Sequence, residues 1–501
     1  MLRNVGSNWV LLAVNVATTY VLTPFIIRTL GNDGYGTWTL IASICGYIGL
    51  FALGVPVACV RYLAQHLAKG DLGKVNATIG SCAGLYLGVG AIAVLAGASV
   101  MPLLHTFAIP EGLEAQASLS FGLMTIYVSA GFIGLLPEGI MLAHHDFVVR
   151  NAVRISVLLL RLGLSVLLLT LRPTLAVLAL VQLACLSFDV STTWYLIVKR
   201  YPGVRISVAD FDWRMVRQIF SFSLYVLLLT AGARLAFETD AIVIGAFLDV
   251  SVIPFYVIAN SLIVYLMELV VSIAAVVSPM ATRLHAEGRM DELRTIFLKW
   301  SKVALSITIV AGLFLIVLGP RFVGWWIDPS YEQPAGRVLQ ILMASSFVFL
   351  PVRGVALPIL IGIGKPQRPA IGFIASGLLN LGLSVALARP LGLAGVALGT
   401  AIPNGLFAAG VLAIACRELE IGAWTYFRYV VPKAALGGIP TLALLLWFRL
   451  GLGVQGLFGL AAAGAATVFL FALTWIFFVY RRDPLVDVSP HLARLLAWGR
   501  A

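Results

Sequence analysis

Residues 8–30 read NWVLLAVNVATTYVLTPFIIRTL, a mostly apolar stretch whose one charged residue is Arg28. A transmembrane helix needs about 20 predominantly apolar residues, so this stretch predicts a membrane span. No small-residue cleavage site interrupts the run from Trp9 to Leu30, and we expect it to stay in the mature protein. Similar runs recur as far as Tyr480, and the mean hydropathy of the 501 residues is +1.00, which excludes a soluble multi-domain protein.

These runs predict an all-α polytopic membrane protein with about fourteen transmembrane helices. In chain order they cover residues 8–30, 36–58, 77–101, 117–141, 152–171, 174–197, 217–245, 253–280, 303–326, 337–362, 369–389, 394–416, 430–449 and 456–480. The long connection at 198–216 contains Pro202-Gly203 and separates six helices from eight. We therefore predict an N-terminal lobe at 1–205, a C-terminal lobe at 206–480 and a tail at 481–501.

The two predicted lobes share a short internal sequence similarity. The sequence RYLAQHLAKGD, at Arg61–Asp71, follows the second span, and RLHAEGRMD, at Arg283–Asp291, follows the eighth. Each runs from an apolar span into a basic helical end with a glycine and an aspartate. Equivalent spans of the same direction would make the lobes parallel repeats about an axis along the membrane normal.

The basic residues gather in alternate loops. Lys and Arg number 34 against 22 Asp and Glu, for a net charge of +12. Lys69, Lys199 and Lys302 belong to the basic set, whereas the opposite loop at 102–116 has no Lys or Arg. This bias predicts that both termini are cytoplasmic. Because the charge is spread over short loops, membrane topology explains it better than a nucleic-acid partner.

The five cysteines lie in or at the ends of apolar stretches, without a CxxC or Cys/His spacing. Such cysteines are typical packing residues rather than members of a disulfide framework or a zinc site. We therefore expect no metal site and no cofactor.

Several arginines lie within or at the edges of the apolar spans. An arginine at the bilayer centre costs about 2.5–3.5 kcal/mol on insertion scales, so it needs a wet or paired interior site. Together these residues predict a cationic cavity, and a cationic cavity fits an anionic cargo. The candidate substrate-binding residues are Arg28, Arg154, Arg161, Arg234 and Arg353.

Two alternatives stay open for most of these arginines. Arg28 lines the cavity or extends to the outer interface. Arg154 and Arg161 are seven residues apart and so share a helix face, but Arg154 is close enough to the cytoplasm to be a topology charge. Arg161 and Arg353 lie deeper, which favours a cavity role.

Acidic residues near the spans are candidates for coupling or ion pairing. Arg234 and Glu238 are four residues apart, with Asp240 nearby, so they predict an ion pair that either opens on binding or is permanently closed. Glu138 and Asp189 either bind a coupling cation, H⁺ or Na⁺, or pair with the arginines.

Short motifs carry a family resemblance over essentially the whole chain. PFIIRTLG at Pro24–Gly31, Arg61-Tyr62 and LGLAGVALGT at Leu391–Thr400 are among them. In order and spacing the chain resembles the oligosaccharide flippases of the polysaccharide-exporter family. That family shares the MOP superfamily with the lipid II flippases and the MATE drug exporters.

The resemblance implies a two-lobe, MATE-like transporter of the bacterial inner membrane that works by alternating access. Its implied cargo is a polyprenyl-pyrophosphate-linked oligosaccharide for surface polysaccharides such as O-antigen, and Arg28 matches an arginine of the family. Polysaccharide polymerases or ligases are the implied protein partners. The alternatives are a MATE-like antiporter, which favours a carboxylate-rich cavity, and a polytopic glycan polymerase or ligase, which needs a larger outer loop.

Overall fold

The computed structural model describes residues 2–52, 54–205, 210–220, 231–232, 234–235, 238–481 and 483–485, with the backbone alone at 2–5. Contacts divide the chain into unit 1, Met1–Arg234 with Glu238–Pro254, and unit 2, Leu235–Phe237 with Phe255–Ala501. This division falls later than the predicted boundary at 205/206 because residues 240–252 pack on the first helix. The lobes at 1–205 and 206–480 and the tail at 481–501 stay a prediction.

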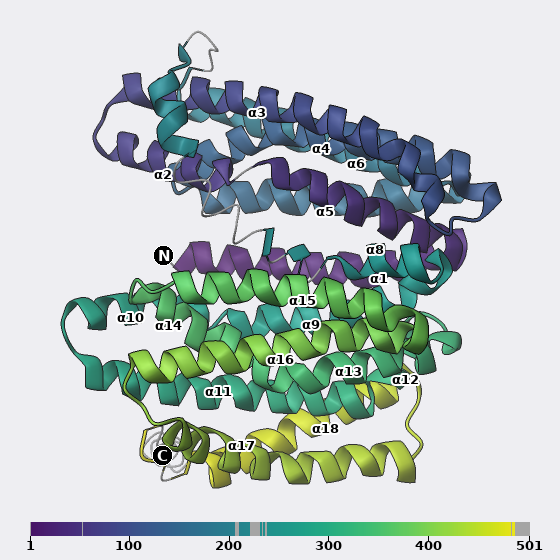
Figure 1. Cartoon of the computed structure of the whole chain (residues 1–501), viewed down its shortest axis with the longest axis vertical. Coiled ribbons are helices and arrows are strands. Elements are labelled where there is room, and N and C mark those ends of the chain that lie inside the picture. The colour runs from purple at the N-terminus through teal and green to yellow at the C-terminus, as the bar shows by residue number, and fades with distance from the viewer. Residues whose placement is uncertain are drawn as a thin grey trace, which may run out of the picture. The chain divides into compact units, whose positions relative to one another are not determined.

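Unit 1 is a bundle of long helices. Helices α3, α4 and α6 run side by side, and α1 packs along α5 (Figure 1). α1 is broken at Gly31, where φ is 71°, a conformation that favours glycine. The described helices are α1 (Leu2–Ile48), α2 (Val55–Ala68), α3 (Leu72–Val100), α4 (Glu114–Ala143), α5 (Phe147–Leu171), α6 (Leu175–Arg200) and α8 (Asp240–Phe247).

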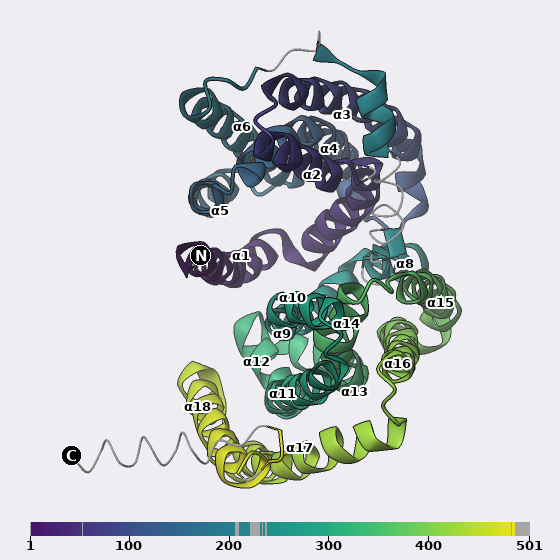
Figure 2. The same ribbon diagram turned by 90° about the vertical axis from the view of Figure 1, so that its left-hand side faces the viewer.

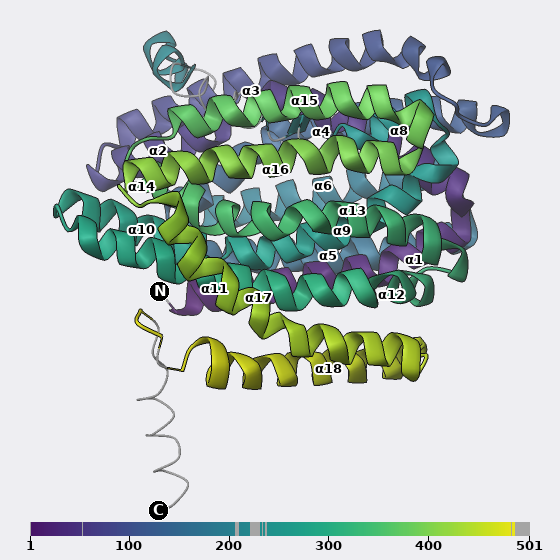
Figure 3. The same cartoon turned by 60° about the horizontal axis from the view of Figure 1, so that its bottom comes forward.

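Unit 2 is also built of helices joined by short connections, with no strand among its described residues. α15 and α16 lie side by side above α13 (Figure 3), while α17 and α18 pair at the margin of the unit, against α11 (Figure 2). The helices are α9 (Ile253–Val271), α10 (Ala274–Ala286), α11 (Met290–Val317), α12 (Gly319–Trp326), α13 (Glu332–Pro351), α14 (Leu357–Gly362), α15 (Gln367–Leu391), α16 (Leu393–Glu418), α17 (Ala423–Leu446) and α18 (Gly456–Thr474).

The number of candidate membrane-spanning helices is close to the predicted number. Twelve stretches of the described residues are long and apolar enough to cross a membrane. The first, Gly6–Ala68, is 63 residues long and contains both predicted spans 8–30 and 36–58. The predicted span at 217–245 lies partly outside the described residues. The all-α polytopic fold is therefore confirmed, and the helix count is consistent with about fourteen spans.

The two similar stretches form the same type of helix end, one in each unit. Gly70 follows α2 with φ 68°, and Gly288 follows α10 with φ 71°. The residue after each glycine donates its N–H to the carbonyl five residues earlier, at 3.1 Å and 2.9 Å. This is the Schellman pattern, in which a glycine takes the left-handed position and the last helical carbonyls are satisfied. The parallel-repeat arrangement of the lobes itself stays a prediction.

The glycines of the Leu391–Thr400 motif let α15 and α16 approach closely. A Cβ on Gly395 would lie 2.0 Å from the carbonyl oxygen of Leu387, and one on Gly399 would lie 2.3 Å from the Oγ of Ser384. The same motif ends in Thr400, which joins a buried network of uncharged side chains. Its hydroxyl lies 3.1 Å from the hydroxyl of Tyr256 and accepts a hydrogen bond of 3.0 Å from Asn380.

Gly395→Ala is expected to destabilise the protein by about 1–3 kcal/mol, because a backbone carbonyl blocks the added methyl group. Gly405→Ala in the same helix is the matched control, since nothing lies within 4 Å of its Cβ position. That change is expected to be neutral or to stabilise by up to about 1 kcal/mol. Thermal unfolding of the purified protein measures both, and equal midpoints would contradict the close α15–α16 contact.

Candidate functional site

A cluster of charged side chains links α4, α5 and α6 in unit 1. Arg150, on α5, is only 5% exposed. Its guanidinium donates to both carboxylate oxygens of Asp189 on α6 and, at 3.3 Å, to Glu138 on α4. Glu138 also pairs with Arg154, one turn after Arg150. Two arginines thus face two acids, so the cluster is formally neutral.

The predicted set included Arg154, Glu138 and Asp189 but missed Arg150, which precedes the predicted span at 152–171. α5 begins at Phe147, so Arg150 is already helical. The spacing of four residues between Arg150 and Arg154 was the available signal, because such residues share a helix face. The acids are therefore paired with arginines, and a coupling role for them stays a prediction.

Arg161 lies two turns further along α5, in a different environment. It lines a pocket of about 140 Å³ together with the hydroxyls of Thr19, Thr23 and Ser165 and the amide of Gln182. At roughly 30 Å³ per water molecule, the pocket has room for about four or five waters. The Nε of Arg161 is buried and has no acceptor among the described residues. None of the described residues that line the pocket is acidic.

The predicted arginines of unit 1 do not meet in one pocket. Arg154, whose side chain is 45% exposed, borders a separate, mostly apolar pocket of about 590 Å³ with Arg61 and Glu138. Arg28 is exposed, three residues before the break in α1, and is not among the described residues lining the Arg161 pocket. Sharing a helix face therefore did not bring Arg154 and Arg161 to a common cavity.

Arg234 and Glu238 form the ion pair that their spacing predicted. Their side chains are 27% and 46% exposed, so the pair lies at an accessible surface of unit 1. The neighbouring Asp240 is buried in the first turn of α8. Opening of the pair on binding, and a coupling role for Asp240, stay predictions.

Arg353 lies in unit 2, in a π-helical turn at Val352–Ala356 between α13 and α14. Its guanidinium carbon is 5.0 Å from the centroid of the Phe373 ring on α15, at the range of a cation–π contact. Its Nε is buried without an acceptor in the described part of the chain. π-turns inside helices often mark functional sites, but a cavity role for Arg353 stays a prediction.

The structure corrects the prediction that Lys302 is a loop charge. The lysine lies inside α11, which begins at Met290, and both it and its ion-pair partner Asp483 have fully buried side chains. Tyr429 donates to Asp483 at 2.6 Å, and the Lys302 ammonium is 4.8 Å and 5.4 Å from the ring centroids of Tyr429 and Tyr480. Burial opposes the ionisation of Asp483, but the hydrogen bonds from Lys302 and Tyr429 outweigh it and lower the pKa of Asp483 below its usual value.

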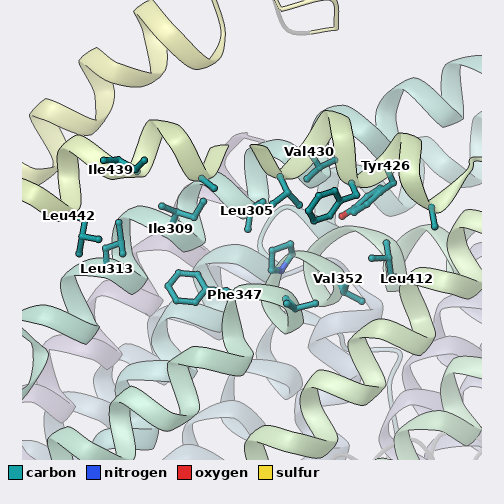
Figure 4. A pocket seen from close by; sticks show the side chains of 17 residues that line it. Leu305, Ile309, Leu313, Phe347, Val352, Leu412, Tyr426, Val430, Ile439 and Leu442 are labelled. Atoms are coloured by element: carbon teal, nitrogen blue, oxygen red, sulfur yellow. The ribbon is translucent and has the colours of Figure 1, made fainter. Parts of the chain in front are cut away.

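One pocket of unit 2 is lined almost entirely by apolar side chains. It has a volume of about 590 Å³ and is formed by 17 residues of α11, α13, α16, α17 and the π-helical turn after α13. Figure 4 shows Leu305, Ile309 and Leu313 of α11 along one side, with Tyr426 and Ile439 of α17 above them. Its size is that of ordinary ligand pockets, and its chemistry suits an apolar chain rather than a sugar.

Known proteins share both sequence and fold with this chain. Residues 1–285 match the family described as Polysaccharide biosynthesis protein. The chain belongs to this family. Among its relatives is the uncharacterized membrane protein EpsK of Bacillus subtilis (strain 168), which is 23% identical over 415 residues, covering 80% of this chain and 79% of EpsK.

Two solved structures show which fold this family member has. The lipid II flippase MurJ, in an inward closed conformation, has a TM-score of 0.70 at 12% identity and covers 93% of this chain and 98% of its own. An inward-facing multidrug resistance MATE family transporter has a TM-score of 0.68 at 18% identity and covers 82% of this chain and 98% of its own. These likenesses confirm the predicted fold, which resembles that of MATE transporters and the lipid II flippase.

Proposed function

We propose that this chain is a flippase that moves a polyprenyl-pyrophosphate-linked oligosaccharide across the membrane by alternating access. The carrying observation is the Arg161 pocket, where a buried guanidinium N–H has no acceptor among the described residues and hydroxyl groups line the same space. Phosphate oxygens are strong acceptors for a guanidinium, which binds them through two parallel hydrogen bonds. The diphosphate of the cargo would supply these acceptors.

The apolar pocket between α11 and α17 supports the same cargo. A polyprenyl chain gains about 25 cal/mol for each Å² of apolar surface that it removes from water, and it needs an apolar wall wherever it leaves the bilayer. Leu305, Ile309 and Leu442 contribute to such a wall. We propose that this pocket holds part of the polyprenyl chain during transport.

The alternative is a MATE-like antiporter for cationic molecules, and the charges of unit 1 argue against it. A cation site needs carboxylates that are open to the cation. Glu138 and Asp189 are instead bound by Arg150 and Arg154. The charge in the neighbouring pocket is the positive one of Arg161, which favours an anionic cargo.

The proposed cargo also defines the setting of the protein. We place it in the inner membrane of a bacterium, with both termini in the cytoplasm, where lipid-linked glycans are made. A polysaccharide polymerase or ligase would then use the exported glycan. Coupling to H⁺ or Na⁺ is part of the proposal, and the candidate carboxylates are Glu138, Asp189, Glu238 and Asp240. The first three are paired with arginines, so each would have to release its arginine in order to bind the cation.

Depletion of the protein in its native host tests the proposed function. We expect polyprenyl-linked glycan intermediates to accumulate and surface polysaccharide to fall, and re-expression of the wild-type chain to reverse both. Extraction and mass spectrometry of the lipid-linked pool measure the first effect. An unchanged pool together with lost drug efflux would contradict the flippase and favour the antiporter.

A further inference from the structure

The Arg234–Glu238 ion pair of unit 1 rests against two consecutive residues of α1, Gly46 and Tyr47. The hydroxyl of Tyr47 donates to the backbone carbonyl of Arg234 at 3.3 Å and is also hydrogen-bonded to the hydroxyl of Thr239. The N–H of Glu238 donates to the same Arg234 carbonyl at 2.8 Å. Thr239 is buried, with 5% exposure. Tyr47 therefore anchors the backbone of Arg234 and the side chain of Thr239 to α1.

Gly46 determines the space that the two charged groups occupy. A Cβ at this position would lie 2.5 Å from Nη1 of Arg234 and 3.2 Å from Oε2 of Glu238. Both atoms are the ends of flexible side chains, so an added methyl group would displace them without moving the backbone. Gly49, three residues later, has nothing within 4 Å of its Cβ position. The two glycines thus differ in whether they touch the ion pair.

We propose that Gly46 and Tyr47 form a seat on α1 that positions the Arg234 guanidinium for an anionic headgroup. This inference rests on the proposed function, in which the cargo carries a diphosphate, and on the prediction that Arg234 is one of the substrate-binding arginines. An anion that draws Arg234 away separates it from Glu238 and removes the guanidinium from Gly46. Binding at Arg234 therefore changes the contact between the ion pair and α1. In this arrangement Gly46 is a positioning residue.

Chemical labelling of the Glu238 carboxylate tests the seat directly. The full-length protein in nanodiscs is treated with a carbodiimide and an amine, and labelling of Glu238 is quantified by mass spectrometry. Gly46→Ala is expected to raise this labelling several-fold, because the displaced guanidinium shields the carboxylate less. Gly49→Ala is the matched control and should label like the wild type. Tyr47→Phe removes the hydroxyl alone and should also raise labelling.

Equal labelling in Gly46→Ala, Gly49→Ala and the wild type would overturn the seat. A rise in labelling would also overturn the seat if Gly46→Ala, but not Gly49→Ala, lowered the thermal unfolding midpoint, since that would indicate general disruption of α1.

Geranylgeranyl pyrophosphate then tests whether a substrate-like diphosphate acts on the ion pair, with geranylgeraniol as the uncharged control. The diphosphate should raise Glu238 labelling in the wild type, whereas the alcohol should not. No response to the diphosphate, with the Gly46→Ala effect intact, would contradict diphosphate binding at Arg234 but not at Arg161, and it would leave the contact between Gly46 and the ion pair in place.

Discussion

Arg161→Ala is expected to reduce glycan export about 100-fold, because each charge-assisted hydrogen bond contributes about 1.5–3 kcal/mol and about 1.4 kcal/mol corresponds to a factor of ten. The alanine removes the one charged side chain among the described residues of its pocket. Arg161→Lys keeps the charge but not the two parallel N–H groups, so it should restore export only in part. The measurement is the lipid-linked glycan pool in the depleted host that expresses each variant.

Arg172→Gln is the matched control for this prediction. Arg172 follows the last residue of the same helix, and its side chain is exposed. Loss of this charge should leave export at the wild-type level. If Arg161→Ala reaches the membrane in normal amounts and exports as well as Arg172→Gln, the diphosphate is not bound at Arg161.

Lys302→Met is expected to lower the free energy of unfolding by about 3–5 kcal/mol, because it removes the ammonium that pairs with the buried carboxylate of Asp483. Both side chains are fully buried, so water cannot replace the lost ion pair. The hydrogen bond from Tyr429 remains but does not neutralise the charge. The thermal unfolding midpoint of the purified protein, measured at neutral pH where Asp483 is ionised, reports this effect.

A second variant separates the ion pair from the packing of the lysine. Lys302→Met with Asp483→Asn removes both charges, and the asparagine oxygen can still accept from Tyr429. Replacement of both members of a buried pair is often close to neutral, so most of the lost stability should return. Lys299→Met, one turn earlier on α11, is the control and should stay within about 1 kcal/mol of the wild type. Equal midpoints for the single and double variants would contradict a stabilising pair.

Local spacing predicted some of the charged contacts and could not predict others. The pair of Arg234 and Glu238 was predictable, because residues four apart on a helix are neighbours whatever the tertiary structure. Arg150 and Asp189 are 39 residues apart, and Lys302 and Asp483 are 181 residues apart. Only helix packing brings these partners together. For the same reason, the common face of Arg154 and Arg161 gave no indication that they line different pockets.

The membrane location, the all-helical class and the approximate number of spans are properties of the amino-acid sequence by itself. They follow because lipid offers no hydrogen bonds to the backbone, so each apolar run of sufficient length must satisfy its own backbone as a helix. Packing between helices decided which buried charges are neutralised and which are not. It paired Arg150 with two acids and placed Arg161 in a pocket with no acidic residue among its described lining. The electrostatic energy of a charge buried in a low-dielectric interior depends on the groups within a few ångströms of it. Those groups come from helices far apart in the chain.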